Sequence, residues 1–358
     1  MTDTAASPLT THRARRVLRR AALVAAAATA AALVAACGGD DDAGGTAASS
    51  GASVFPVTVE HKFGETTVPS DPQRIAVIGL SEQDIVLALG KQPIATTEWY
   101  GEQPSAVWPW AQDELGDAKP TVLSAADGFQ FEKIASLRPD LIIGTNAGVQ
   151  QADYTKLSAI APTIPGPKGS TDYFSPWDEQ TVQVAKALGK ETEGKALVEK
   201  IKADYAAGAK ANPEFAGKVT TFSQNAFYDG KLYVYPPGLN TEFLSMLGFT
   251  INPELTPLAP APGQQAEISA ENLSKIDADV LVVAAEKPED IPALEQVPTY
   301  ARLGAVTGRR TVYTDPVLSG AMYFISPLSL PYVLEELTPQ LKAAVAGQAP
   351  NRIRTTTP

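Results

Sequence analysis

Between residues 54 and 347, two kinds of apolar pattern alternate along the chain. Short unbroken apolar runs, typical of strands buried on both faces of a parallel sheet, alternate with segments whose apolar residues recur at helical spacing. The runs are RIAVIG, PIATT, DLIIG and APTIP in the first half, and KVTTFSQ, LYVYP, VLVV and RTVYT in the second. The pattern predicts an α/β protein with parallel sheets.

Two segments far apart in the chain have similar sequences. FEKIASLRPDLII and AENLSKIDADVLV align without gaps, which pairs Glu132 with Glu271 and Asp140 with Asp279. In each segment, apolar residues three apart predict a short helix with the glutamate in its first turn, and a buried strand follows. The repeat therefore predicts two similar lobes.

A long helix is expected between the two halves. The stretch ETEGKALVEKIKADYAAGAKA carries Ala196, Leu197, Ile201 and Tyr205 at helical spacing. A helix of about 20 residues is about 30 Å long, the width of a small domain, so it could join the lobes. An ordinary surface helix is the alternative.

These patterns divide the folded part of the chain into four segments. A first lobe over residues 54–176 opens with an edge hairpin or extended pair, VFPVTVEHKFGETTVP. A helical segment over 177–212 contains the joining helix, and a second lobe occupies 213–347. We expect residues 348–358 to form a disordered tail.

The chain begins with a segment that is not part of this fold. RARRVLRR is followed by an apolar run from Ala21 to Ala36, shorter than the roughly 20 residues that span a bilayer, so residues 1–36 are predicted to be an export signal. The only cysteine, Cys37, ends this run in a sequence that resembles the bacterial lipobox. That resemblance implies a lipidated Cys37 on the outer face of the cell membrane; a small buried thiol is the alternative. Residues 37–53 are a predicted flexible tether, and the paired arginines leave the export route open.

Charge and composition exclude several classes of protein. Removal of residues 1–36 takes away five arginines and Asp3, which leaves 24 basic against 39 acidic side chains and disfavours nucleic acid as a partner. No G-x-S-x-G motif is present, and His61 is the only histidine outside the signal. We therefore expect no enzyme, no zinc or manganese receptor and no catalytic residue. An exported hydrolase that uses a carboxylate pair is the competing hypothesis.

Many segments in fixed order resemble one family. HKFGETTVPSDPQRIAVIG, FEKIASLRPDLIIG, LNTEFLSMLGF, ISAENLSKIDADVLVV and GRRTVYTD, together with the lipobox and the long helix, are similar to substrate-binding lipoproteins of ABC importers for ferric siderophores, haem and vitamin B12. This resemblance implies two Rossmann-like lobes joined by one rigid helix, with the ligand in the cleft between them. It also implies that Glu132 and Glu271 dock into arginine pockets of a paired permease. A carboxylate that only complements a helix dipole is the alternative for each.

Ligand contacts are expected in the loops that follow the strands, because ligands gather at the carboxyl ends of parallel strands. Those loops are rich in aromatic residues, which suit a large organic chelate. The predicted ligand-binding residues are Trp99, Tyr100, Trp108, Asn146, Lys168, Tyr173, Trp177, Asn225, Tyr228, Tyr235 and Tyr323.

The expected cargo is a ferric siderophore, and its iron arrives inside the chelator, so no resident cofactor or metal site is expected. An anionic chelate would need positive charge, for which Lys168 is the main candidate and Arg302 a weaker one. A neutral hydroxamate chelate is equally compatible with the sequence. Haem, cobalamin, or a role as an envelope protein that binds another protein remain alternatives. We expect a monomer that works with an ABC permease dimer.

Overall fold

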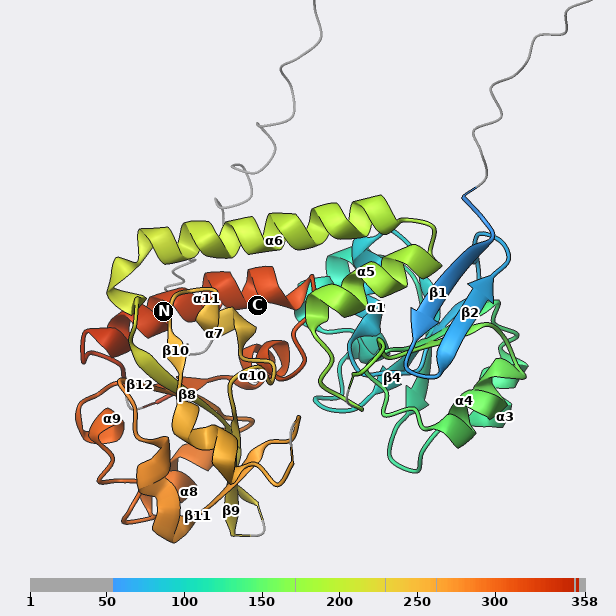
Figure 1. Ribbon diagram of the computed structural model, residues 1–358. Helices are drawn as coiled ribbons and strands as arrows, with labels where there is room; N and C mark the ends of the chain where they lie inside the picture. The colour runs from blue at the N-terminus through green and yellow to red at the C-terminus, as the bar shows by residue number, and fades with distance from the viewer. Residues whose placement is uncertain (1–53, 171, 229, 262, 351, 354–358) are drawn as a thin grey trace, which may run out of the picture. The chain divides into compact units, whose positions relative to one another are not determined.

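The computed structural model describes residues 54–170, 172–228, 230–261, 263–350 and 352–353. Within them, two separate sheets form the centres of two lobes, joined by helices (Figure 1). The predicted export signal, Cys37 and the tether lie outside the described residues.

The first lobe is built on a five-stranded parallel sheet with the order β5-β4-β3-β6-β7. Its strands are β3 (Ile75–Val77), β4 (Pro93–Glu98), β5 (Thr121–Ser124), β6 (Leu141–Gly144) and β7 (Thr163–Pro165). The predicted extended pair is a separate antiparallel hairpin of β1 (Val57–His61) and β2 (Gly64–Val68). The helices of this lobe are α1 (Glu82–Ala88), α2 (Gln112–Leu115), α3 (Phe131–Ser136) and α4 (Gln151–Ser158), with short 3-10 turns η1 (Pro104–Ala106) and η2 (Pro109–Ala111).

Strand β6 shows why its apolar run is unbroken. Leu141 and Ile143 belong to a cluster with α1 and α5, whereas Ile142 belongs to a cluster with α3 and α4. Since both faces of the sheet are covered, every side chain of the strand is buried, as expected for a central parallel strand.

The second lobe contains a mixed sheet with the order β11-β9-β8-β12-β13, and β10 pairs with β8. Strands β8 (Val219–Tyr228), β10 (Thr250–Ile251), β12 (Val280–Ala284) and β13 (Thr311–Thr314) are mutually parallel where they pair. In contrast, β9 (Lys231–Tyr235) pairs antiparallel with β8, and β11 (Ala266–Ser269) pairs antiparallel with β9. The expectation of a purely parallel second sheet was wrong, because β8 and β9 form a hairpin across a short turn.

The helices of the second lobe are mostly short. They are α7 (Glu242–Ser245), α8 (Asp290–Glu295), α9 (Gly304–Thr307), α10 (Pro316–Tyr323) and α11 (Ser329–Val345), with 3-10 segments η3 (Pro213–Phe215), η4 (Pro253–Leu258) and η5 (Ala270–Ile276). Beyond α11 the chain stays packed. Ala349 is 1% exposed and its N–H donates to the carbonyl of Arg309 at 3.0 Å, so a disordered tail that begins at residue 348 was wrong at this position.

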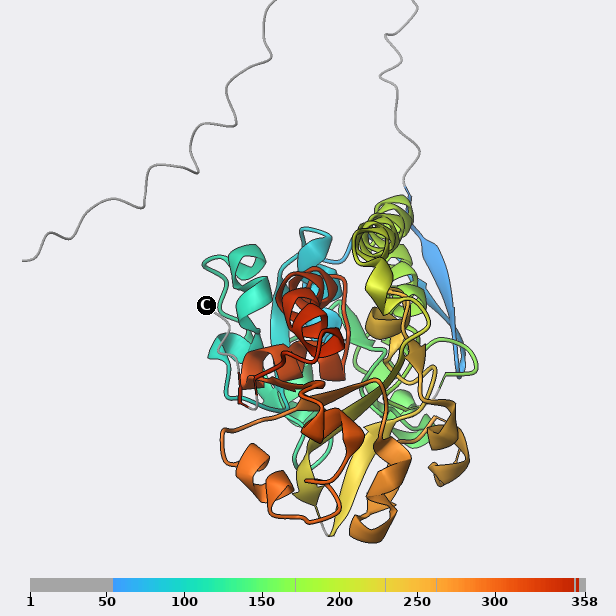
Figure 2. The ribbon, with the colours of Figure 1, turned by 90° about the vertical axis from the view of Figure 1, so that its left-hand side faces the viewer.

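Two helices connect the lobes. Helix α5 (Trp177–Ala187) packs on the first lobe, and α6 (Glu191–Ala211), with 21 residues, continues to the second lobe, where it runs beside α11 (Figures 1 and 2). A Cβ at Gly194 would lie 2.3 Å from that of Ala185, so glycine permits the close approach of α5 and α6. The hydroxyl of Tyr205 donates to the carbonyl of Leu330 at 2.9 Å, which fixes α6 on α11. The predicted long joining helix is confirmed.

The aspartates of the internal repeat have the same structural role in both copies. Asp140 accepts the backbone N–H groups of Gln73 and Arg74, both at 2.8 Å, just before β3. Asp279 accepts the N–H of Val219, the first residue of β8, at 2.9 Å. Each copy therefore fixes the start of a central strand in its own lobe. The copies differ in their helices, because the first is an α-helix and the second is the 3-10 helix η5.

Candidate functional site

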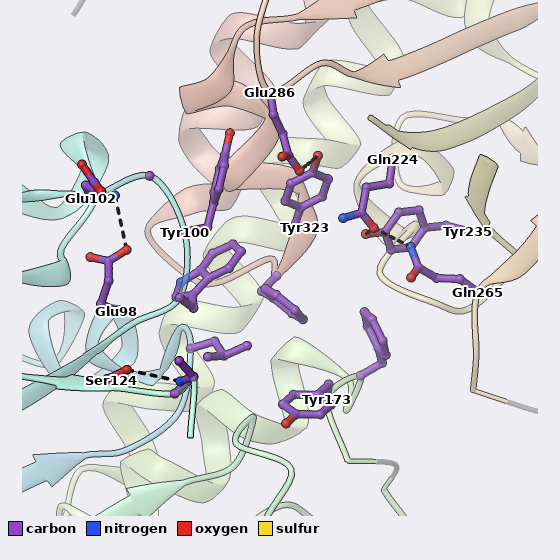
Figure 3. A pocket seen from close by; sticks show the side chains of 17 residues that line it. Glu98, Tyr100, Glu102, Ser124, Tyr173, Gln224, Tyr235, Gln265, Glu286 and Tyr323 are labelled. Carbon is purple, nitrogen blue, oxygen red and sulfur yellow. Dashed lines mark hydrogen bonds between the residues drawn. The ribbon is translucent and has the colours of Figure 1, made fainter. Parts of the chain in front are cut away.

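A cavity of about 790 Å³ lies where loops of both lobes meet (Figure 3). The first lobe contributes residues that end or follow β4 and β5, such as Trp99 and Ser124. The second contributes Gln224 within β8, Tyr235 at the end of β9 and Glu286 after β12. The volume falls in the range of roughly 300 to 1,000 Å³ that small-molecule sites occupy. The cavity is at the carboxyl ends of strands, where α/β proteins bind ligands.

Aromatic rings form a continuous wall that crosses from one lobe to the other. Trp99 meets Phe324 edge to face with ring centroids 5.0 Å apart, and Phe324 stacks on Phe174 at 5.6 Å. Phe174 in turn lies 6.3 Å from Tyr235 of β9. Offset and edge-to-face pairs of this kind stabilise the wall and offer apolar area to a ligand.

Behind this wall, Trp108 supports the ligand-facing rings and does not itself line the cavity. It is 2% exposed and stacks on Trp110 with centroids 5.0 Å apart and planes 10° apart. Its ring also lies against Gly320 of α10, where a Cβ would be only 2.4 Å away. Trp108 therefore packs between the first lobe and the second. It also contacts Tyr100, and the two ring centroids are 5.3 Å apart.

The loop after β4 that carries these rings has an unusual backbone. Gly101 has φ +82°, and the L residues Glu102, Ser105 and Ala106 have φ between 49° and 58°. Left-handed backbone is costly for residues other than glycine and is concentrated at functional loops of proteins. In this loop it turns the chain sharply between the cavity-lining residues and the buried Trp108.

Three carboxylates face the cavity. Glu98 ends β4 and accepts the N–H of Glu102 at 3.3 Å, and burial raises the pKa of Glu98. Glu286 follows β12, and its Oε1 lies 2.9 Å from the hydroxyl of Tyr323 (Figure 3). Burial, and secondarily the charge of Glu286, raise the pKa of the Tyr100 phenol, so this hydroxyl stays protonated at neutral pH.

Neutral polar groups complete the wall on the second lobe. Gln265 donates from Nε2 to Oε1 of Gln224 at 2.9 Å, and the hydroxyl of Tyr235 lies 3.4 Å from the same oxygen (Figure 3). These side chains offer amide and phenol groups to a ligand without adding charge.

Five of the sequence-predicted ligand residues do not line this cavity in the described structure. Trp177 begins α5 and is 3% exposed in the core that α6 and α11 share, while Asn146 is 2% exposed and donates to Ser81. Lys168 lines a different hollow beside α5 and α6. Tyr228 is 69% exposed at the β8–β9 turn and lines a hollow that adjoins the cavity, and Trp108 is the buried support described above.

Five predicted residues are brought together by the structure. They are Trp99, Tyr100, Tyr173, Tyr235 and Tyr323, which line the cavity. Asn225 belongs to β8, but its side chain is outside the described part of the molecule. The sequence reasoning missed Glu98, Glu102, Gln224, Gln265 and Glu286. For Glu98 and Glu286 a signal existed, because Glu98 directly follows the predicted strand PIATT and Glu286 comes three residues after the predicted strand VLVV.

The two glutamates of the repeat lie on the surface of different lobes. Glu132 is exposed in the first turn of α3, and Glu271 is exposed in the first turn of η5. The backbone N–H of Glu271 and, secondarily, the hydroxyl of Ser269 lower the pKa of the Glu271 carboxyl. Both positions are open to a partner.

No helix in the described part of the chain is long and apolar enough to cross a membrane. Among the same residues, no group of three or more His, Cys, Asp or Glu side chains could hold a metal ion. His61 is 2% exposed and its Nε2 lies 3.0 Å from the hydroxyl of Thr66, which gives it a structural role in the β1–β2 hairpin.

Comparison with known proteins agrees with this architecture. The chain is 30% identical over 238 residues to the probable siderophore-binding lipoprotein YfiY of Bacillus subtilis (strain 168), an alignment that covers 63% of this chain and 67% of YfiY. A periplasmic solute binding protein from Mycobacterium smegmatis is similar in structure with TM-score 0.75 and 38% identity, over 81% of this chain and 98% of that one. The PiaA protein of Streptococcus pneumoniae TIGR4, solved in complex with ferrichrome, has TM-score 0.70 and 26% identity, over 81% and 99%.

These similarities extend through both lobes and the joining helix. The family described as periplasmic binding protein matches residues 75–318, which run from β3 into α10. The resemblance read from the sequence motifs is thereby confirmed, and this chain belongs to the periplasmic binding protein family.

Proposed function

We propose that this protein captures a ferric siderophore in the cavity between its lobes and delivers it to an ABC importer. The observation that carries the proposal is the cavity of about 790 Å³, walled by aromatic rings from both lobes. Such a wall provides apolar area and phenol and amide groups, which suit the organic shell of a chelate. The similarity to YfiY, a probable siderophore-binding lipoprotein, and to PiaA, solved in complex with ferrichrome, supports the same class of ligand.

In this proposal the protein binds the chelator and does not ligate the metal. The groups that face the cavity are mainly rings, amides and separate carboxylates, whereas Fe(III) capture would need a converging cluster of ligands. The iron therefore arrives and leaves inside its chelate, and no resident cofactor is needed.

Anchoring and delivery complete the proposed function. Lipidation of Cys37 would hold the protein at the outer face of the membrane through the tether that follows it. Glu132 and Glu271 would then contact the permease, one from each lobe, because they are exposed carboxylates at equivalent positions of the repeat.

Tryptophan fluorescence tests ligand capture, because Trp99 lines the cavity and Trp108 lies directly behind it. The purified protein would be titrated with ferric siderophores of hydroxamate, catecholate and carboxylate type, with haem and with cobalamin. We expect saturable quenching by at least one ferric siderophore and not by its iron-free form at the same concentration. Saturation by haem or cobalamin alone, or by nothing in the panel, would overturn the proposal.

A further inference from the structure

Among the described residues, the ionisable groups of the cavity wall are carboxylates and phenols. Glu98 and Glu102 come from the first lobe and Glu286 from the second, and none of the described residues that line the cavity is lysine, arginine or histidine. Glu98 and Glu286 are half-buried, which weakens screening by water, so their charges act more strongly on a bound ligand than a fully exposed charge would.

The surroundings of the cavity do not supply the missing positive charge. The adjoining hollow shares Glu286 with the cavity and adds Lys287, but it also contains Glu289 and Asp290. On the Tyr173 side, Lys62 is paired with Asp172 at 3.1 Å, and Lys231 is paired with Glu267. Lys168, the candidate cation of the sequence analysis, lines a separate hollow.

The other groups of the wall favour a cation as well. Aromatic faces carry negative potential and attract alkylammonium groups.

We propose that the cavity selects ferric chelates that bear a protonated amine, and that Glu286 binds this ammonium group. This inference rests on the proposed function and specifies the charge of its ligand. A hydroxamate chelate fits, because three hydroxamates neutralise Fe(III) and an added amine makes the complex cationic. Triscatecholate and citrate complexes carry negative charge and would meet three carboxylates without a compensating base.

Glu286 is the best placed of the three carboxylates. The hydroxyl of Tyr323 donates to its Oε1 at 2.9 Å, which orients the carboxylate, and Tyr100 lies beside it in the wall (Figure 3). Glu98 already accepts a backbone N–H from Glu102, and Glu102 is exposed at the rim. A carboxylate that is oriented, half-buried and flanked by rings forms a strong charge-assisted hydrogen bond with an ammonium group.

The test compares two ligands that differ by one charge. The first is the ferric complex of a linear trihydroxamate with one free primary amine, and the second is the same complex after N-acetylation of that amine. Ferric citrate and a ferric triscatecholate complete the panel. The purified protein is compared with Glu286→Gln and with Glu193→Gln, which removes an equal charge from an exposed position on α6.

We expect the amine-bearing complex to bind about tenfold more tightly than its acetylated form, the scale of a hydrogen bond to a charged group. Glu286→Gln should reduce this ratio to about twofold or less, and Glu193→Gln should leave the ratio intact. Added salt should lower the ratio, because it screens the charges.

The two proposals fail in different ways. Equal binding of the amine and acetylated forms, tighter binding of an anionic complex, or the same response from both variants would overturn the charge selection and leave siderophore capture standing. Absence of quenching by every ferric complex would overturn siderophore capture and the charge selection with it.

Discussion

A single buried carboxylate links the two lobes beside the cavity. Oδ2 of Asp84 in α1 accepts hydrogen bonds from Trp110 at 2.8 Å and from Ser326 of the second lobe at 2.5 Å. Its Oδ1 is buried without a partner in the described part of the chain. Burial raises the pKa of Asp84 from 3.8 to about 6, which the two hydrogen bonds only partly offset.

This pKa predicts a pH dependence of stability. Because the folded pKa lies above the unfolded one, the stability contributed by neutral Asp84 is complete below about pH 3.8 and is lost as the pH rises through about 6. The full loss corresponds to about 3 kcal/mol. Asp84→Asn removes the buried charge and keeps an acceptor. The thermal midpoint of the variant, measured from pH 4 to pH 8, should rise relative to wild type as the pH increases.

An exposed carboxylate provides the control for this experiment. Asp113→Asn in α2 removes the same charge from a solvated position. Its difference from wild type should change little over the same pH range. If Asp84→Asn followed the same flat course, burial of an ionised Asp84 would not be the cause of the pH dependence.

Substitutions of Trp99 and Trp177 distinguish a loss of ligand binding from a loss of core packing. Trp99 lines the cavity and meets Phe324 of the opposite lobe, so Trp99→Ala should weaken siderophore binding about tenfold or more through lost aromatic contact. Trp177→Phe should lower the thermal midpoint by about a few degrees and leave affinity within about twofold, because Trp177 is a core residue. Calorimetric titration and thermal unfolding measure the two effects. Equal loss of affinity in both variants would contradict the assignment.

At the scale of elements, the sequence was informative where burial is simple. The apolar run in DLIIG was predicted to form a strand, and it forms β6. An unbroken apolar run of this kind is typical of a parallel strand that is covered on both faces of its sheet. LYVYP was predicted to be a strand and forms β9, but its antiparallel direction was not predicted, because pairing direction depends on the chain's return through the β8–β9 turn. Strand β11 was not predicted. The alternating apolar and polar residues of AEIS, typical of an antiparallel strand, were the available signal.

The site was only partly predictable for a similar reason. Strand ends identify loops, and the aromatic residues in those loops include Trp99 and Tyr100, which line the cavity. The same loops contain Trp108, which is buried because its ring packs against α10. Which ring faces the ligand depends on packing between lobes, and that packing leaves no periodic pattern in the sequence. Gln265 comes from an irregular proline-rich passage and had no signal.

A close approach between two loops provides a prediction at this scale. Gly148 has φ +64°, and a Cβ there would lie 2.5 Å from the ring of Tyr173 at the cavity rim. Gly148→Ala should lower stability by about 1 kcal/mol through backbone strain, and it should also displace Tyr173 and weaken ligand binding. Urea unfolding and ligand titration measure the two quantities.

The variant Gly169→Ala distinguishes the effect of backbone strain from the effect of displacing Tyr173. Gly169 has φ +79° with nothing within 4 Å of its Cβ position, so the same backbone cost should appear without movement of a side chain. We expect a similar loss of stability and unchanged affinity. A similar affinity for ligand in both variants would show that the position of Tyr173 does not matter for binding.

At the scale of the whole molecule, the repeat places one exposed glutamate on each lobe, and the long helix α6 joins those lobes. A permease made of two similar subunits presents two similar surfaces, so paired contacts from two lobes match its approximate two-fold symmetry. A single contact would fix the position of the protein but not its orientation. In the proposed delivery step, two contacts on separate lobes would fix both and would bring the cavity mouth to one place.

The double variant Glu132→Ala/Glu271→Ala tests this arrangement. Because both side chains are exposed and neither lines the cavity, we expect siderophore affinity and thermal midpoint to stay near wild type, whereas siderophore-dependent iron uptake by cells that carry the variant as their only copy should be abolished. Glu193→Ala/Glu335→Ala removes two exposed glutamates from α6 and α11 and should transport normally. Normal uptake by the first variant, or loss of its ligand affinity, would contradict the docking role. Each single variant should retain part of the uptake, since one lobe would still be held.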